Sequence, residues 1–325
     1  MIHRRTVLGT SLLTLGLSRL ARGQARSTIR FAHEAPPTHA KGLWAQWFKD
    51  GAESAGGVTV QLFPQGQLYK SEQAALEATI SGAIQMAIPS TGYLSSVAPW
   101  FEVFDLPMLF ADEAALHRFQ DSETGGVLLA RLRERGLVGL AYASNVALDL
   151  FSRVPIREIG DFAGRKIRVH SAPLERTVRA LGGNPVTIPA AELFIALQQG
   201  VVDGALTTVA FAAPNRYHEV TKYLTRCSLS AVCYAAVMNA GFHASLPEPT
   251  RAAIAQAAAA ASKRNRESLA DQTARHLETL RRGGVTVIDL AASQRAIWQQ
   301  RLAQLYDDAA RRIDPALIEQ ARRIG

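Results

Sequence analysis

The feature that most constrains the fold is a repeated alternation of strand-like and helix-like segments. Between residues 28 and 93, three short apolar segments alternate with two longer segments of helical periodicity, and the same order returns between residues 137 and 208. This alternation is typical of parallel sheets covered by helices on both faces. Two such units in one chain predict two α/β lobes with a cleft between them. The strand-like segments are TIRFA, VTVQLF and IQMAI in the first unit, and LVGLAYAS, RKIRVHS, NPVTIP and VVDGALTT in the second.

The carboxyl-terminal third has a different pattern, because residues of high helix propensity dominate it from Glu248 to about Arg282. A continuous helix of this length would extend about 50 Å at about 1.5 Å per residue, which exceeds the size of one lobe. We therefore expect one helix that crosses both lobes. A strand at VTVIDL and a last amphipathic helix from Ser293 to Arg312 should follow it.

The first 25 residues have the order of an export signal. Arg4 and Arg5 precede an apolar run from Val7 to Leu17, and small residues follow up to Ala25. The run is too short to span a hydrocarbon core of roughly 30 Å, and the paired arginines favour the twin-arginine type of signal. The alternative is a membrane-anchoring helix that stays in place. The signal interpretation predicts a periplasmic protein.

The charge of the remaining chain is nearly balanced. Residues 1–25 hold four of the 36 basic residues and no acidic one, which leaves 32 basic and 28 acidic residues and a net charge of +4. The sequence has no block of like charges and no basic stripe with aromatic residues, so it does not support nucleic-acid binding.

Cys227 and Cys233 are expected to be buried thiols. A disulfide between them would need a tight reversal of the chain, which an oxidising compartment permits.

The segment GRKIRV carries the main candidate for ligand binding. Side chains alternate along a strand, so Ile167 and Val169 share one face while Lys166 and Arg168 share the other. Ligands of open α/β sheets bind beyond the carboxyl ends of the strands, and Arg168 lies near such an end. A guanidinium offers two parallel donors that match a carboxylate. Two interpretations stay open, because Arg168 could bind a ligand carboxylate or form a structural ion pair with an Asp or Glu of the chain.

Several segments, taken in order, resemble the extracytoplasmic solute-binding subunits of tripartite ATP-independent periplasmic (TRAP) transporters, the DctP-like family. The resemblance implies an α/β, two-lobe periplasmic-binding-protein fold with hinge strands and a long helix spanning both lobes. It also implies closure around one small solute, commonly an organic acid, and delivery to the small and large permease proteins in the membrane. The matching segments are IRFAHEAPPTHAKG, VTVQLFPQGQL, MAIPSTGYLSSVAPWFEVFDLPMLF, DFAGRKIRV, ALGGNPVTIPAAELFIALQQGVVDGA and HEVTKYL. We expect the first lobe to hold residues 26–145 and 234–272, and the second lobe 146–233 and 273–325.

The resemblance also implies roles for individual residues. Arg168 occupies the position of the arginine that forms the main salt bridge to the ligand carboxylate. Thr207 stands where many relatives have an asparagine, and Leu148 where many have a second arginine, with Asp149 beside it. The site would then have one positive charge fewer. It would suit a monocarboxylate, or a solute with a hydroxyl or amine that Asp149 accepts; alternatively, Asp149 is a solvated loop residue.

Further candidates lie in loops at strand ends. The two histidines of HEAPPTH are six residues apart across two prolines, whereas zinc proteases place theirs four apart on a helix, so we expect neither a metal ion nor a cofactor. Some relatives bind their acid through a metal ion, which leaves a cation co-ligand open. The further ligand-binding candidates are Glu34, Ser90 and Thr91 in the first lobe, and Thr208 and Phe211 after the strand of Thr207.

The predicted function is therefore capture of a small carboxylate-containing organic acid by the periplasmic subunit of a TRAP-type importer, without catalysis. Two alternatives stay open. One is a ligand-sensing binding protein that serves a membrane receptor. The other is an exported hydrolase, for which the sequence offers no evident pair of nucleophile and base.

Overall fold

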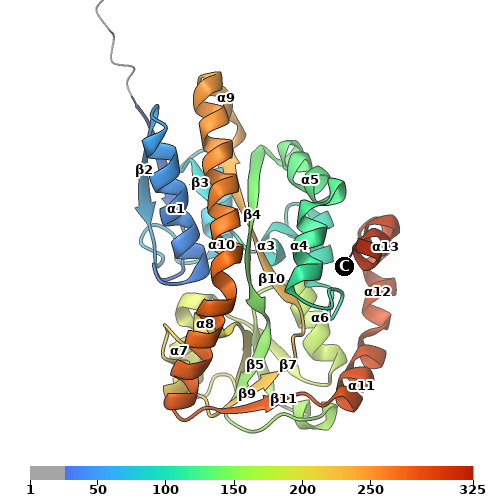
Figure 1. The fold of residues 1–325 in the computed structure, drawn as a ribbon. Helices are drawn as coiled ribbons and strands as arrows, with labels where there is room; N and C mark the ends of the chain where they lie inside the picture. Colours follow the sequence, from blue (N-terminus) through green and yellow to red (C-terminus); the bar gives the residue numbers. More distant parts are fainter. Residues whose placement is uncertain (1–25, 325) are drawn as a thin grey trace, which may run out of the picture.

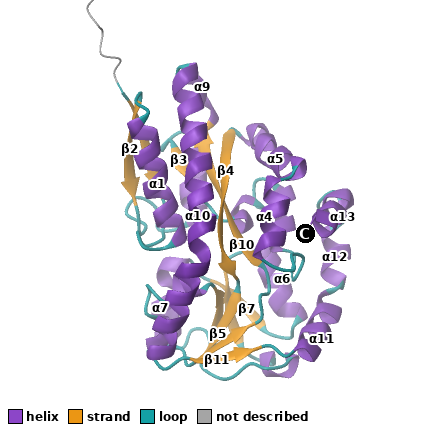
Figure 2. Cartoon of the chain, viewed as in Figure 1, coloured by secondary structure: helices purple, strands orange, loops and turns teal. Residues whose placement is uncertain are grey.

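The computed structural model describes residues 26–324, so the predicted export signal lies outside the described residues. The strands form two separate sheets with helices packed around them (Figures 1 and 2). The first sheet has the order β2-β1-β3-β10-β4, and its strands are β1 Ser27–Ala32, β2 Val58–Phe63, β3 Met86–Ala87, β4 Leu137–Ala147 and β10 Ala231–Asn239. The second has the order β11-β9-β5-β8-β6-β7, with β5 Asp149–Ser152, β6 Lys166–Val169, β7 Asn184–Thr187, β8 Gly204–Thr207, β9 Tyr223–Arg226 and β11 Thr286–Asp289. The predicted two-lobe α/β fold is confirmed.

The first sheet forms because its strands can bury one set of alternating side chains. Ile29 and Phe31 of β1 are fully buried, whereas the alternating residues Thr28 and Arg30 are exposed. The Phe31 ring packs edge-on against Trp44 of α1 Ala40–Ser54, with the ring centroids 6.3 Å apart. This contact fixes α1 on the sheet and places the loop after β1 at the edge that faces the second lobe.

The sheets are mixed, which corrects the expectation of parallel sheets. β10 pairs antiparallel with both β3 and β4, and β5 pairs antiparallel with both β8 and β9. The physical reason is that two of the chain's crossings between the lobes run through these strands. It leaves the first lobe along β4 and enters the second at β5, then returns along β10 beside β4, so the outgoing and returning strands run in opposite directions.

The predicted long helix is confirmed as α10 Glu248–Arg282, which has 35 residues. It packs against α1 and β4 and also against α8 Val209–Ala212, so it contacts both lobes along its length (Figure 1). Hydrogen bonds join the middle of α10 to α1 and β4. Trp44 Nε1 donates to Ser262 Oγ at 3.0 Å, and the backbone N–H of Ser144 in β4 donates to Asn265 Oδ1 at 2.8 Å.

The carboxyl-terminal segment departs from the expectation that residues 273–325 lie in the second lobe. α11 Ala292–Leu302 packs against α6 Ala172–Ala180 of the second lobe. After α12 Gln304–Ala309, the last helix α13 Pro315–Ile324 contacts α4 Glu113–Asp121 and the 3-10 helix η1 Pro99–Asp105 of the first lobe. Leu317, Ile318 and Ala321 bury one face of α13 in the first-lobe core. The end of the chain therefore straps the two lobes together (Figure 1).

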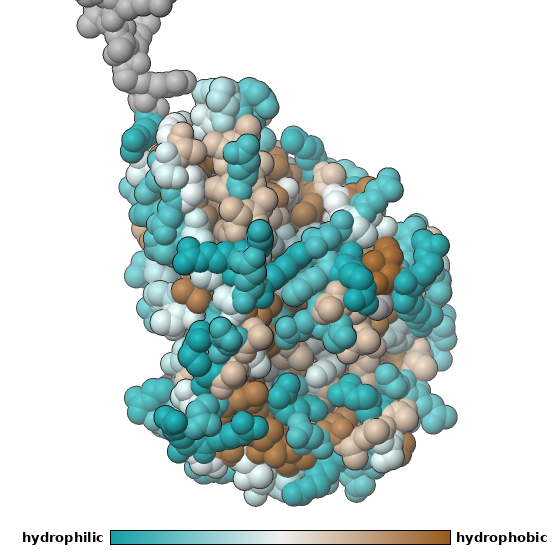
Figure 3. All heavy atoms as spheres, viewed as in Figure 1, coloured by the Kyte–Doolittle hydropathy of each residue, from teal (hydrophilic) through white to brown (hydrophobic). Residues whose placement is uncertain are grey.

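Cys227 and Cys233 are both free and buried, as expected. The face drawn in Figure 3 carries mainly hydrophilic residues with hydrophobic ones scattered between them. Among residues 26–324, no helix combines the length and apolar character that crossing a bilayer requires. The other helices are α2 Glu72–Ile80, α3 Thr91–Leu94, α5 Glu123–Ala130, α7 Leu193–Gln199 and α9 Ala240–Ser245, with 3-10 helices η2 Arg131–Arg135, η3 Ile159–Phe162, η4 Ala190–Glu192 and η5 Tyr217–Glu219.

Candidate ligand-binding site

The guanidinium of Arg168 is buried without a carboxylate partner among the described residues. Strand β6 lies between β7 and β8, so the Arg168 side chain is only 3 % exposed. Its Nε donates to the carbonyl of Ile188 at 2.8 Å, and Nη1 makes a long contact of 3.4 Å with the carbonyl of Leu206. Burial lowers the pKa of Arg168, and the groups around it, Glu72 and Glu34 among them, offset this only in part. The structural ion pair considered for this residue is not formed within residues 26–324.

Arg168 lines a cavity at the junction of the lobes with a volume of about 40 Å³. Six of the eight candidate residues line it: Arg168, Thr207, Thr208 and Phe211 from the second lobe, and Glu34 and Ser90 from the first. The candidate residues therefore converge from segments far apart in the sequence. The other residues that line the cavity are Glu72, Leu148, His170, Ala190, Val232 and Tyr234.

Asp149 and Thr91, the other two candidates, have different positions. Asp149 is 2 % exposed in β5, where its carboxylate accepts from Arg226 Nε at 3.0 Å and from the backbone N–H of Ser228 at 2.9 Å. Both interpretations of Asp149 are therefore corrected, since it is neither among the cavity-lining residues nor solvated. Adjacent residues of an extended chain face opposite sides, so Leu148 faces the cavity instead. Thr91 Oγ1 donates to the carbonyl of Cys233 at 3.2 Å.

The first-lobe wall of the cavity is a buried cluster of two carboxylates and one ammonium. Lys41 Nζ lies 2.7 Å from Glu34 Oε1, 3.2 Å from Glu72 Oε1 and 4.3 Å from the centre of the Tyr234 ring. Burial alone would lower the pKa of Lys41, but Glu34 and Glu72 outweigh burial and raise it, so the ammonium stays charged. Burial, reinforced by Glu34, raises the pKa of Glu72.

The sequence did not reveal Glu72 and His170, which line the cavity, or Lys41, which pairs with Glu34 and Glu72. Lys41 and Glu72 each stand in the first turn of a helix that follows a strand-end loop, and this placement was the available signal. His170 directly follows β6. Burial, with the nearby Arg168 charge, lowers the pKa of His170 to about 3, so its imidazole is neutral at neutral pH.

Hydroxyl groups complete the lining. Ser90 Oγ is buried and has no hydrogen-bond partner, although the Ser90 backbone N–H donates to Glu72 Oε2. Thr208 Oγ1 accepts from Asn145 Nδ2 and from the backbone N–H of Phe211, each at 3.2 Å. Asn145 Nδ2 also donates to the Tyr234 hydroxyl at 2.8 Å, which ties β4 to β10, while its bond to Thr208 joins these strands to the second lobe. A buried hydroxyl without a partner is costly, so Ser90 Oγ is suited to a ligand contact.

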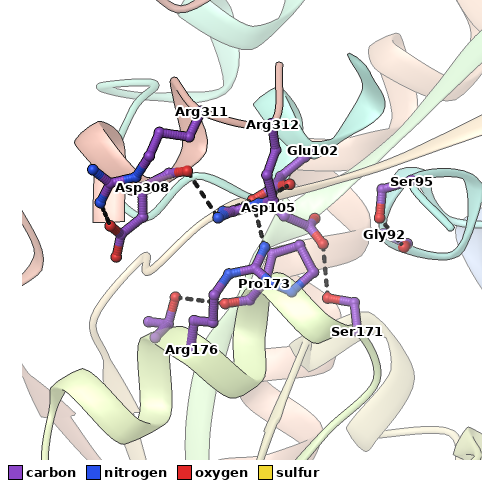
Figure 4. Close-up of polar contacts among 11 residues, drawn as sticks. Gly92, Ser95, Glu102, Asp105, Ser171, Pro173, Arg176, Asp308, Arg311 and Arg312 are labelled. Atoms are coloured by element: carbon purple, nitrogen blue, oxygen red, sulfur yellow. Dashed lines mark hydrogen bonds and ion pairs between the residues drawn. The ribbon is translucent and has the colours of Figure 1, made fainter. Parts of the chain in front are cut away.

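A second polar cluster joins the lobes (Figure 4), in a groove that shares His170 with the cavity and so borders its rim. Glu102 of η1 lies between two arginines: Arg176 of α6 donates to it from the second lobe, and Arg312 Nε of the carboxyl-terminal segment donates at 3.1 Å. Beside it, Ser171 Oγ donates to Asp105 Oδ2 at 2.8 Å. Burial raises the pKa of Asp105 to about 6. We call Glu102, Arg176, Arg312, Asp105 and Ser171 the rim cluster.

Two α/β lobes that are connected by crossing strands, with a polar cavity at their junction, define a bilobal ligand-binding protein. The sequence model of the DctP family, described as "Bacterial extracellular solute-binding protein, family 7", matches residues 31–312, and the chain belongs to this family. The resemblance noted in the sequence is thereby confirmed.

Relatives support this membership over nearly the full length. The chain is 33 % identical to the C4-dicarboxylate-binding periplasmic protein DctP of Rhodobacter capsulatus, over 98 % of this chain and 97 % of the relative. It is similar to a TRAP periplasmic solute-binding protein from Shewanella oneidensis solved with bound succinate, at a TM-score of 0.89 and 28 % identity, over 92 % of this chain and 99 % of that one. A TRAP protein from Xanthobacter autotrophicus with bound β-D-galacturonate has a TM-score of 0.86 and 27 % identity, over 91 % of this chain and 98 % of that one.

Proposed function

We propose that this chain captures a small carboxylate-containing organic acid between its lobes and delivers it to the membrane subunits of a TRAP-type importer. One observation carries the proposal: Arg168 is a buried guanidinium that lines the cavity and has no carboxylate partner among the described residues. A buried charge is costly unless it is paired. A ligand carboxylate would supply the missing anion and could accept two parallel hydrogen bonds.

The ligands named for the two similar structures, succinate and β-D-galacturonate, both carry a carboxylate and support this chemistry. The ligand would contact Arg168 from the second lobe together with Glu34 and Ser90 from the first. Because those contacts form together only when the lobes meet, binding favours the closed state. Separation of the lobes would then release the ligand to the transporter.

We further propose a periplasmic location and no catalysis. A periplasmic relative covers 98 % of the chain, and the paired arginines of residues 1–25 favour export. A hydrolase would need a nucleophile bonded to a general base. The Ser90 hydroxyl in the cavity has no such partner, which favours binding over hydrolysis.

A thermal-shift screen of organic acids tests the proposal. Ligand at about 100 times its Kd stabilises the folded protein by about 2.7 kcal/mol, which raises Tm measurably. Carboxylates should raise the Tm of the wild type, whereas neutral sugars should leave it unchanged. Arg168→Ala should lose the shift with unchanged circular dichroism. A shift with neutral sugars alone, or normal carboxylate binding by Arg168→Ala, would contradict the proposed role.

A further inference from the structure

We propose that the cavity selects a small hydroxy monocarboxylic acid and discriminates against dicarboxylates. The inference rests on the proposed function and concerns the half of the ligand that points away from Arg168. Its basis is the arrangement of charge and donors around that half, in Glu34, Glu72, Lys41 and Leu148.

With Glu34 and Glu72 both ionised, the first-lobe wall has one negative charge more than it has positive ones; burial raises the pKa of Glu72, and the Lys41 ammonium opposes that rise. Glu34 and Glu72 share the single ammonium of Lys41, which lies within 3.2 Å of both. Arg168 is the cation among the described residues that line the cavity, and the imidazole of His170 is neutral. Once one ligand carboxylate occupies Arg168, a second would face two carboxylates whose counter-charge is already used. Like charges brought together across a site are strongly unfavourable.

Leu148 removes the remaining place for a second anion. It lines the cavity between β4 and β5, where its buried side chain offers no hydrogen-bond donor. The neighbouring Asp149 is bonded to Arg226, and that arginine does not line the cavity. The described residues thus provide one site for a carboxylate, at Arg168, and an apolar surface beside it.

The wall instead accepts hydrogen bonds. Carboxylate oxygens of Glu34 and Glu72 that already bond to Lys41 retain lone pairs, because each oxygen accepts about two hydrogen bonds. The unpartnered Ser90 Oγ lies on the same wall and can both donate and accept. A ligand hydroxyl satisfies both kinds of group, since it donates to a carboxylate and accepts from a serine. A keto group could only accept.

The space is small. A cavity volume of about 40 Å³ compares with about 10–15 Å³ needed to hold one water molecule. About three waters fill this volume, so any acid requires the cavity to widen, and a short acid requires the least widening. Long sugar acids should require a wider opening of the lobes.

Matched pairs of probes separate the two ligand classes. 4-Hydroxybutyrate differs from succinate, and 3-hydroxypropionate from malonate, only by a CH₂OH group in place of a carboxylate. Isothermal titration at about pH 8, where ordinary carboxyls are ionised, should give each hydroxy acid a Kd at least about tenfold lower than its dicarboxylate. Butyrate and propionate, which lack the hydroxyl, should also bind more weakly than their hydroxy acids. D-Gluconate tests the size limit and is expected to bind more weakly than the short hydroxy acids.

Two variants test the residues. Glu72→Gln removes one negative charge from the wall and should shift the ratio of Kd values toward the dicarboxylates by about tenfold. Glu77→Gln, on the exposed side of the same helix, is the matched control and should leave the ratio unchanged. Leu148→Arg adds a cation between β4 and β5 and should favour succinate, while Glu34, Glu72 and Lys41 of the first-lobe wall stay unchanged.

The outcomes distinguish this inference from the proposed function. Succinate or malonate binding as tightly as its hydroxy acid, and depending on Arg168, would overturn the specificity and leave carboxylate capture intact. Failure of every carboxylate in the thermal-shift screen would overturn both. Tighter binding of D-gluconate than of the short acids would overturn the size limit. A preference for hydroxy acids that Glu72→Gln reduces would support the inference.

Discussion

Arg168 and Arg176 lie eight residues apart in the second lobe, and their surroundings are opposite. Arg176 reaches across the rim to Glu102 of the first lobe, and about a third of its side chain is exposed. Arg168 is 3 % exposed at the cavity and bonds only to backbone carbonyls. The comparison shows that the chain itself supplies the anion for the rim arginine but not for the cavity arginine. One arginine therefore joins the lobes, and the other is available to a ligand.

The largest expected effect is that of replacing Arg168, which should weaken ligand binding without destabilising the fold. Arg168→Met removes the partner of the ligand carboxylate, which should weaken binding by about 100-fold or more, given about 3–5 kcal/mol for breaking a buried ion pair. The ligand-free protein should keep its stability or gain about 1 kcal/mol, because an unpaired buried charge is replaced by an apolar side chain. Titration calorimetry and urea unfolding measure the two effects.

Arg179→Met is the control for this experiment, since Arg179 is exposed on α6. A large loss of stability in ligand-free Arg168→Met would show that Arg168 supports the fold, and the contrast with Arg176 would fail.

A smaller effect is expected at the rim. Glu102→Gln weakens the contacts with Arg176 and Arg312, and hydrogen bonds to charged groups contribute about 1.5–3 kcal/mol before screening. Both arginines are about a third exposed, so screening reduces this value. Ligand affinity should fall by about tenfold or less through loss of the closed state, and mainly through faster dissociation.

Stopped-flow kinetics and a salt series check the rim prediction. The wild type should lose affinity as salt rises, and Glu102→Gln should show a shallower dependence. Glu267→Gln, which breaks an exposed pair with Lys263, should behave like the wild type. A loss as large as that of Arg168→Met would mean that the rim, and not the cavity, dominates binding.

The smallest effect is a pH dependence at Asp105. Burial raises its pKa from 3.8 to about 6, so between these values the native state holds a proton that the unfolded chain has released. Asp105 therefore makes the free energy of unfolding decrease as pH rises through this interval, and the penalty is complete above about pH 6. Asp105→Asn should gain stability relative to the wild type over the same interval.

The stability of Asp105→Asn has to be compared with that of the wild type, because two buried histidines have the opposite effect. His33 and His170, with pKa values lowered to about 3, make the free energy of unfolding increase as pH rises. Urea unfolding at several pH values gives the difference between Asp105→Asn and the wild type. A difference that does not vary with pH would contradict the raised pKa.

Much of the fold could be predicted because it depends on local patterns. Helix α10 begins and ends at the expected residues Glu248 and Arg282, since propensity over a long segment is a strong signal. Ser71 accepts from the backbone N–H of Ala74 and caps α2, as serine at the start of a helix commonly does. The direction of β10 and the docking of α13 on the first lobe were missed, because strand direction and helix docking depend on distant partners.

The site was predicted to the same extent and for the same reason. Strand-end positions indicated Arg168 and Glu34, and the family resemblance indicated Thr207; all three line the cavity, because parallel strands bring their carboxyl ends to one edge. Asp149 was a candidate for ligand contact, but Leu148, the residue before it, lines the cavity instead, because adjacent residues of an extended chain face opposite sides. Lys41 was missed because a lysine in a helix is usually solvated, and nothing local indicates that two carboxylates enclose it.

From the order of its residues, this chain specifies two α/β units, one long helix and an arginine at the end of a buried strand. These features follow from periodicity and propensity, which act over a few neighbouring residues. The separation of a paired Arg176 from an unpaired Arg168 arises only after folding. Glu102 reaches Arg176 from 74 residues away, and the electrostatics of a buried charge depend on every group that folding brings near it.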